Sequence, residues 1–195
     1  MFGPTQLDIA VAALLYGGRQ AYGEIADGLH QLEGGDPSSL LRNFDDYVGR
    51  SGNGTYSSDW AAFIASSCAD GPNLTVPDFE ALQAKAAVDA PDFGAINVGL
   101  GFACSYWPVP GANAVPTPIH GAGAPPIIVV GTTGDPATPV AWARNLVGEL
   151  GSGRLITVDG TTHTSLLSHN RCLDAAVTSY LVELVPPAPD LRCRA

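Results

Sequence analysis

Two short apolar runs joined by a helical interval constrain the fold of this chain more than any other feature. Ile127 to Val130 is a continuous β-branched run between Pro125-Pro126 and Gly131, which is typical of a strand buried on both faces in a parallel sheet. Val140 to Leu150 follows with apolar side chains at helical spacing, and Leu155 to Val158 is a second candidate strand. A strand, a helix and a second strand predict one parallel crossover unit of an α/β fold.

The carboxyl ends of these two strands carry an acid and a base. Asp135 lies in a Gly-Asp-Pro turn after the first strand, and His163 lies in a Gly/Thr-rich loop after the second. Because neighbouring parallel strands end at the same edge of a sheet, where catalytic groups gather, the two side chains can meet. A buried carboxylate that accepts the Nδ1 proton of an imidazole fixes its tautomer and stabilises the imidazolium formed during catalysis. We therefore predict an acid/base pair.

Each member of the pair has an alternative interpretation. Gly-Asp-Pro forms turns well without any catalytic role, and a loop histidine can be merely solvated. His169, six residues after His163, is an alternative base. Trp142 is expected to pack, and Tyr106 and Trp107 are expected in a core or a pocket wall.

The sequence contains no obvious nucleophile for such a pair. In α/β-hydrolases the Ser lies upstream of the Asp and the His, on a strand-to-helix elbow of the form G-x-S-x-G. No such pentapeptide occurs here. The segment around Ser51, Gly-Arg-Ser-Gly-Asn, fails at its last position and lies in a polar loop without a preceding strand. We therefore do not expect Ser51 to be catalytic.

Several short patterns, spread from about Leu7 to Cys193, share one order along the chain. They are Ala12-Ala13-Leu14-Leu15-Tyr16, Gly34-Gly35-Asp36, Ala65-Ser66-Ser67-Cys68-Ala69-Asp70, Cys104-Ser105-Tyr106-Trp107-Pro108, Gly134-Asp135-Pro136-Ala137-Thr138-Pro139, Gly160-Thr161-Thr162-His163 and Asn170-Arg171-Cys172. Together they resemble the carboxyl-terminal half of an actinobacterial secreted α/β-hydrolase of the tripeptidyl aminopeptidase type, in the prolyl aminopeptidase superfamily of serine peptidases.

The resemblance implies a fold and a function. The fold is an α/β-hydrolase fragment, in which a helical cap region precedes the last two parallel strands and helices of the sheet. The function is that of a serine hydrolase or exopeptidase that cleaves peptide or ester bonds, with triad roles on Asp135 and His163. We expect the nucleophile, the oxyanion-hole loop and the first strands to lie in a missing amino-terminal half, acting in cis or in trans. This chain alone is expected to be inactive; the alternative is a non-catalytic remnant or an interaction module.

Three regions follow from the spacing and the composition of the chain. Residues 1–107 have helical spacing and no strand able to join the sheet, so the resemblance assigns them to the cap. Residues 108–126 are rich in Pro and predict an ordered, extended connection, and residues 127–195 carry the strand-helix-strand-helix part. Asp70 in the cap has two interpretations. It is a structural residue at a helix end, or it binds a free peptide amino terminus, as acidic cap residues do in related aminopeptidases.

The four cysteines form an even set. Their order favours pairing Cys68 with Cys104 and Cys172 with Cys193, although four cysteines allow three connectivities. The second pair would tie the last helix to an otherwise loose Pro-rich tail, from Pro186 to Ala195. Disulfides fit an oxidising compartment, and the resemblance implies a secreted or cell-envelope protein. A zinc site is the alternative for these cysteines, but C-x-x-C spacing is absent.

The charge balance disfavours two classes of partner. The chain has 19 acidic and 9 basic residues, for a formal net charge of -10. Nucleic acid and anionic membrane surfaces are not expected partners, because binding them requires clustered Lys and Arg. The apolar run from Ile9 to Leu15 is too short to span a bilayer and lacks the basic flank of a signal peptide, so we expect any export signal in the missing half. No metal or cofactor is expected.

Overall fold

The computed structural model describes residues 2–71, 73–109 and 120–194 of the chain. The described residues form two compact units, one of residues 2–11 and 31–109 and the other of residues 12–30 and 120–194. Residues 12–30, which the sequence assigns to the cap, therefore group with the strands. Of the Pro-rich connection expected at 108–126, residues 110–119 lie outside the described residues.

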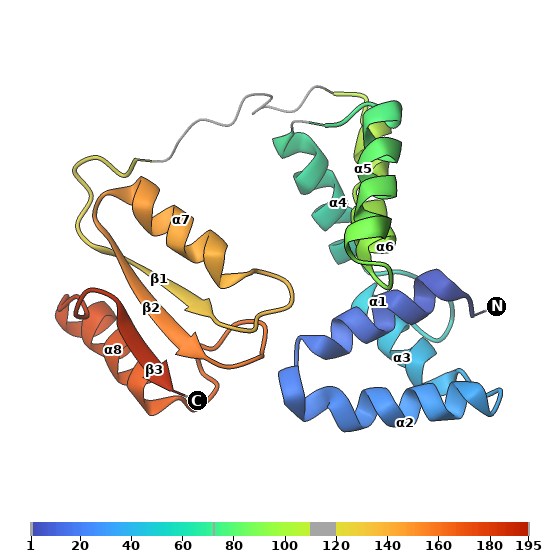
Figure 1. The fold of residues 1–195 in the computed structure, drawn as a ribbon, viewed down its shortest axis with the longest axis horizontal. Helices are drawn as coiled ribbons and strands as arrows, with labels where there is room; N and C mark the ends of the chain where they lie inside the picture. The colour runs from blue at the N-terminus through green and yellow to red at the C-terminus, as the bar shows by residue number, and fades with distance from the viewer. Residues whose placement is uncertain (1, 72, 110–119, 195) are drawn as a thin grey trace. The chain divides into compact units, whose positions relative to one another are not determined.

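The part of the chain before the strands is helical, as the spacing predicts (Figure 1). Side-chain caps explain two of the helix starts, because the Ser57 hydroxyl accepts from the Asp59 N–H and the Thr75 hydroxyl accepts from the Asp78 N–H. The helices are α1 (Pro4–Leu15), α2 (Tyr22–Glu33), α3 (Ser38–Tyr47), α4 (Ser58–Asp70), α5 (Val76–Asp89) and α6 (Gly94–Gly99), with 3-10 helices η1 (Gly18–Ala21) and η2 (Phe102–Tyr106).

A disulfide and an aromatic contact hold the end of the helical unit together. Cys68 in α4 is bonded to Cys104 in η2, which confirms the first predicted pairing. The rings of Phe79 and Phe102 lie 4.9 Å apart and join α5 to η2. No helix in the described part of the chain is long and apolar enough to cross a membrane.

The second unit contains a small parallel sheet, which confirms the predicted crossover. Strand β1 (Ile127–Thr132) leads through α7 (Val140–Leu150) to β2 (Gly153–Asp159), and Val129 of β1 pairs with Leu155 of β2. Gly131 lets α7 approach closely, because a Cβ there would lie 2.9 Å from the Ala143 Cβ. The Tyr180 hydroxyl of α8 (Arg171–Glu183) donates to the Pro126 carbonyl just before β1.

The core of this unit lies between the sheet and α8. It is built from Ile156 and Val158 of β2, Leu173 of α8 and Cys193, all almost fully buried. Ile128 and Val130 of β1 pack against this cluster. Because side chains alternate along a strand, these two residues face α8 while Gly131 faces α7, and the sheet is covered on both faces (Figure 1).

The carboxyl-terminal tail contains a strand that the sequence does not predict. Residues Leu191–Arg194 form a third parallel strand, β3, beside β2, and the sheet order is β1-β2-β3. Cys193 faces the core and is bonded to Cys172 of α8, which confirms the second predicted pairing. The sequence does not indicate this strand because a run of four residues with two arginines is too short and too charged for a strand pattern.

Candidate active site

The turn after β1 is fixed by the loop after β2. The Thr133 N–H donates to the Val158 carbonyl at 2.9 Å, and the Gly134 N–H donates to the Gly160 carbonyl at 2.8 Å. A Cβ on Gly134 would lie 2.9 Å from the same Gly160 oxygen, so this approach requires glycine. The residue that follows, Asp135, is therefore carried by a turn with little freedom to move.

The Asp135 carboxylate is almost enclosed, with a side-chain exposure of 4%. Its Oδ1 accepts hydrogen bonds from the backbone N–H groups of Ala137 and Thr138, each at 2.8 Å, and its Oδ2 accepts from the Thr138 hydroxyl at 2.8 Å. Burial raises the pKa of this carboxyl, but these bonds and the one with His163 outweigh it and lower the pKa from 3.8 to about 2. Asp135 is therefore ionised at neutral pH.

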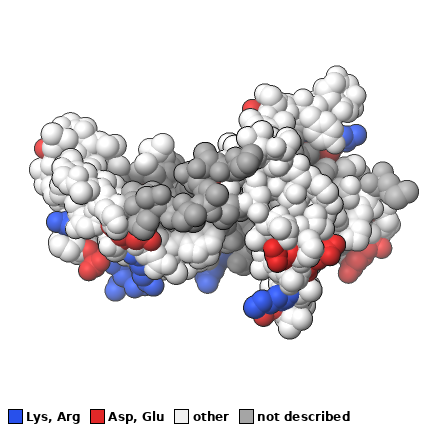
Figure 2. Space-filling model, turned by 90° about the horizontal axis from the view of Figure 1, so that it is seen from above, with Lys and Arg blue, Asp and Glu red and all other residues white. Residues whose placement is uncertain are grey.

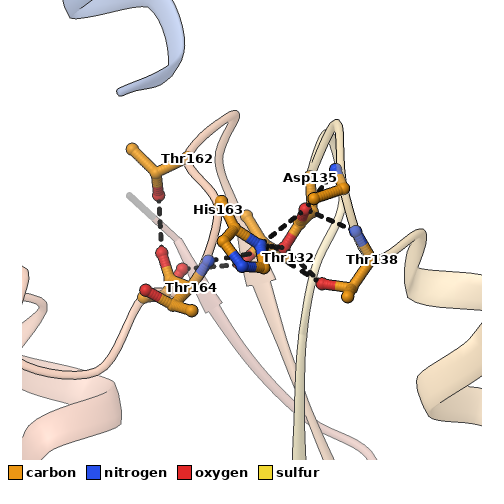
Figure 3. Close-up of polar contacts among 8 residues, drawn as sticks. Thr132, Asp135, Thr138, Thr162, His163 and Thr164 are labelled. Carbon is orange, nitrogen blue, oxygen red and sulfur yellow. Dashed lines mark hydrogen bonds and ion pairs between the residues drawn. The ribbon is translucent and has the colours of Figure 1, made fainter. Parts of the chain in front are cut away.

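The two side chains that the sequence predicts to meet lie in contact (Figure 3). The Nδ1 atom of His163 is 3.1 Å from both carboxylate oxygens of Asp135, and the Thr138 hydroxyl lies 3.4 Å from the same nitrogen. An ionised carboxylate favours the tautomer with the proton on Nδ1. Every hydrogen bond of the ring within the described residues uses Nδ1, so Nε2 is left for a further partner.

A segment far away in sequence braces the histidine loop. The backbone N–H of His163 donates to the Tyr16 carbonyl at 2.9 Å. The centroids of the two side-chain rings lie 4.7 Å apart, and the ring planes are inclined at 52°. Gly18 is buried at a φ of +65°, and a Cβ there would lie 2.6 Å from the Thr161 hydroxyl oxygen. That same hydroxyl accepts from the Arg19 N–H at 3.0 Å. The sequence does not predict this brace, and its one local signal is the Gly17-Gly18 pair directly after Tyr16.

The loop from Gly160 to Asn170 is held in an unusual backbone conformation. Thr164, Leu167 and His169 have φ values of 64°, 65° and 64°, in the left-handed region that non-glycine residues seldom adopt. A buried contact of 2.6 Å between the hydroxyls of Thr132 and Ser165 ties the loop to the end of β1. Backbone strain of this kind gathers at functional sites, where the surrounding contacts maintain it.

The other candidate site residues from the sequence have different surroundings. His169 is exposed, and its ring has no carboxylate partner within the described residues. The Ser51 hydroxyl is engaged in a local turn, with Asn53 at 2.6 Å and the Thr55 carbonyl at 2.9 Å. Asp70 is the exposed last residue of α4, in the helical unit, and its role in binding a peptide amino terminus stays a prediction.

The site offers acid/base chemistry and no evident metal centre. Among the described residues, no group of three or more His, Cys, Asp or Glu side chains could hold a metal ion. The four cysteines are bonded to one another and cannot act as ligands. The His163 imidazole, with its tautomer fixed by Asp135, can accept a proton from a nucleophile at Nε2 and donate it to a leaving group.

Comparison with known proteins adds to this geometry. Residues 90–193, a little more than half of the chain, match the family described as TAP-like protein. Similar proteins include Carboxylesterase B of Mycobacterium tuberculosis, 38% identical over 179 residues, and Serine protease Hip1 of the same species, 33% identical over 173 residues. The alignments cover 89% and 87% of this chain but 34% and 33% of the relatives. The chain thus spans about a third of the length of the curated relatives that it matches.

Proposed function

This chain belongs to the TAP-like family of α/β-hydrolases, and we propose that Asp135 and His163 are two members of a serine-hydrolase triad. The observation that carries the proposal is the contact of His163 Nδ1 with the Asp135 carboxylate, which leaves Nε2 open. Both residues follow the carboxyl ends of neighbouring parallel strands, where the Asp and the His of α/β-hydrolases are placed. A Ser outside this sequence completes the triad.

The reaction is acyl transfer from a peptide or an ester. The Ser hydroxyl attacks the substrate carbonyl while His163 takes the hydroxyl proton at Nε2, and Asp135 stabilises the resulting imidazolium. The imidazolium then donates its proton to the leaving amine or alcohol, and an acyl-enzyme remains. Water attacks the acyl-enzyme with His163 again acting as the base, which releases the acid product and restores the Ser.

The class of substrate is inferred from the names of the relatives. One relative is named a carboxylesterase and another a serine protease, so both ester and peptide bonds are candidate substrates. The partner is the nucleophile-bearing half, in cis or in trans. Two disulfides support an oxidising compartment, and we place the complete protein outside the cytoplasm or in the cell envelope.

Activity measurements with and without the nucleophile-bearing half test this proposal. The purified chain should neither hydrolyse a p-nitrophenyl ester nor label with a fluorophosphonate probe, whereas the complete protein should do both. In the complete protein, His163→Ala should lower the hydrolysis rate by orders of magnitude, and the matched His169→Ala should change it little. A crippling His169→Ala beside a nearly silent His163→Ala would refute the assignment. A complete protein without any activity would favour the non-catalytic alternative.

A further inference from the structure

A cavity of about 840 Å³ lies beside the histidine loop. It opens at the carboxyl ends of β2 and β3, between the segment after Tyr16 and the first turn of α8, and all of its lining residues belong to the unit that contains the sheet. Thr161 and Thr162, which directly precede His163, form part of its wall. The cavity therefore adjoins the proposed acid/base pair without containing either of its members.

The charge of the cavity is opposite to that of the whole chain. Arg19, Arg171 and Arg194 line it, which is a third of the 9 basic residues in a chain of net charge -10. The one carboxylate among the lining residues, Asp159, binds the guanidinium of Arg192 at 3.0 and 2.5 Å. On the face drawn in Figure 2 most of the described surface is uncharged, and charged residues make up 14% of the chain, so three arginines around one cavity are a local concentration of positive charge.

The negative charge of the Asp159 carboxylate is already compensated by neighbouring arginines. Hydrogen bonds from Arg192 lower the pKa of Asp159 below its usual value; burial works in the opposite direction, and the charges of Arg192 and Arg194 lower it further. Asp159 is therefore paired with Arg192, which does not line the cavity, and its charge also acts on Arg194. It does not compensate the charges of the other two lining arginines, Arg19 and Arg171.

Two of the lining arginines, Arg19 and Arg171, have unused N–H donors within the described residues. Within the described residues, the side chains of Arg19 and Arg171 make no hydrogen bond or ion pair, although each guanidinium carries five N–H donors. They come from different elements and face one cavity. Asn170 caps the Leu173 N–H at 3.1 Å, and the first free N–H groups of α8, a helix of 13 residues, add partial positive charge to the same wall.

We propose that this cavity binds an oxyanion, either a phosphate group or a carboxylate, held between Arg19 and Arg171. Charge-assisted hydrogen bonds from guanidinium groups match both anions and provide the recognition. A bound anion would link the segment after Tyr16 to the start of α8, on either side of the loop that carries His163. Binding needs no hydrolysis, so it can be tested separately from the triad.

The test is a titration of the full 195-residue chain followed by amide and arginine NMR signals, at constant ionic strength in chloride. Inorganic phosphate is one probe, and N-acetyl-Ala-Ala with a free carboxylate, compared with its carboxamide, is the other. We expect saturable shifts around Arg19 and Arg171 with phosphate or with the free acid, and none with the amide. The amide comparison leaves the protein unchanged, so it does not depend on the folding of any variant.

Paired substitutions locate the site. Arg19→Gln with Arg171→Gln should weaken binding by about tenfold or more, because two charge-assisted contacts are lost. Arg42→Gln with Arg144→Gln removes the same charge from exposed positions outside the cavity and should change the affinity less than about twofold. Binding of phosphate alone or of the free acid alone would assign the anion. Unsaturable shifts with both probes, equal binding of the amide, or equal weakening by the two pairs would overturn the proposal.

Discussion

The substitution Asp135→Asn isolates what the carboxylate does, because the structure determines how the new amide must point. Oδ1 accepts from two backbone N–H groups, of Ala137 and Thr138, and only the carbonyl oxygen of an asparagine can replace it there. The amide nitrogen must then take the place of Oδ2, facing His163 Nδ1 and the Thr138 hydroxyl. Nδ1 lies 3.1 Å from both positions, and the NH₂ group at one of them can only donate a hydrogen bond. We therefore expect Nδ1 to become the acceptor and the ring proton to move to Nε2.

The magnitude has two parts. A pKa of about 2 instead of 3.8 corresponds to at most about 2 to 3 kcal/mol of native-state stabilisation. The His163 side chain is 28% exposed, and solvent screening there reduces this value, so we expect Asp135→Asn to lower the free energy of unfolding by about 1 to 2 kcal/mol. The effect on catalysis is larger. A protonated Nε2 cannot accept the proton of the Ser, and the same change in another serine protease lowers kcat about 10⁴-fold.

Long-range ¹H–¹⁵N correlation of the imidazole measures the tautomer directly in the chain alone. At a pH where the ring is neutral, wild-type His163 should carry its proton on Nδ1, and Asp135→Asn should carry it on Nε2. His169, which has no carboxylate partner within the described residues, serves as the internal control and should not change. If His163 already carries the proton on Nε2 in the wild type, or if the variant leaves the tautomer unaltered, the reasoning is wrong.

Three further outcomes follow from the same contacts. Because its folded pKa is depressed, Asp135 should contribute its stability above pH 3.8 and lose it as the pH falls toward about 2; denaturant unfolding across this window should show the loss in the wild type and a smaller one in Asp135→Asn. Gly18→Ala places a Cβ 2.6 Å from the Thr161 hydroxyl oxygen at a φ of +65°, so it should cost about 2 kcal/mol or more and shift the His163 signals. Gly23→Ala in α2, with open space around the Cβ, should leave both readouts nearly unchanged, and equal effects of the two changes would argue against the brace. Strand β1 is an edge of the sheet formed by the described residues, so the isolated chain should self-associate; a monodisperse monomer in size-exclusion chromatography, with a sharp thermal transition, would contradict this.

The sequence predicts the elements whose signals are local. The β-branched run of β1 and the apolar spacing of α7 lie in short stretches, and chain order alone favours the pairs Cys68–Cys104 and Cys172–Cys193. The contact of Asp135 with His163 follows in one further step, because parallel neighbours end at the same edge of a sheet. The inferences about β1, α7 and the contact of Asp135 with His163 need only the geometry of one crossover unit, and the disulfide pairs need only the order of the cysteines.

The features that the sequence does not predict depend on contacts between distant segments. Strand β3 has four residues and alternating arginines, and it becomes a strand only because β2 offers an open edge and Cys193 is bonded to α8. The Arg19 to Thr161 hydrogen bond joins residues 142 positions apart, and no spacing rule reaches that far. Local patterns therefore predict the contact of Asp135 with His163 but not the segment that holds the histidine loop in place.

Asp135 and His163 should respond differently to substitutions elsewhere in the chain. The Asp135 carboxylate is positioned by its own turn, with donors two and three residues away, so it should survive changes elsewhere in the chain. His163 is held by that carboxylate and by Tyr16, whose carbonyl accepts its N–H and whose ring lies against its own. Tyr16→Ala removes the ring but keeps the carbonyl, and should loosen the imidazole while leaving Asp135 ordered. NMR relaxation of the His163 ring compared with the Thr138 amide separates these effects: equal loosening of both would show that the turn and the histidine loop move as one body, contrary to the contacts described.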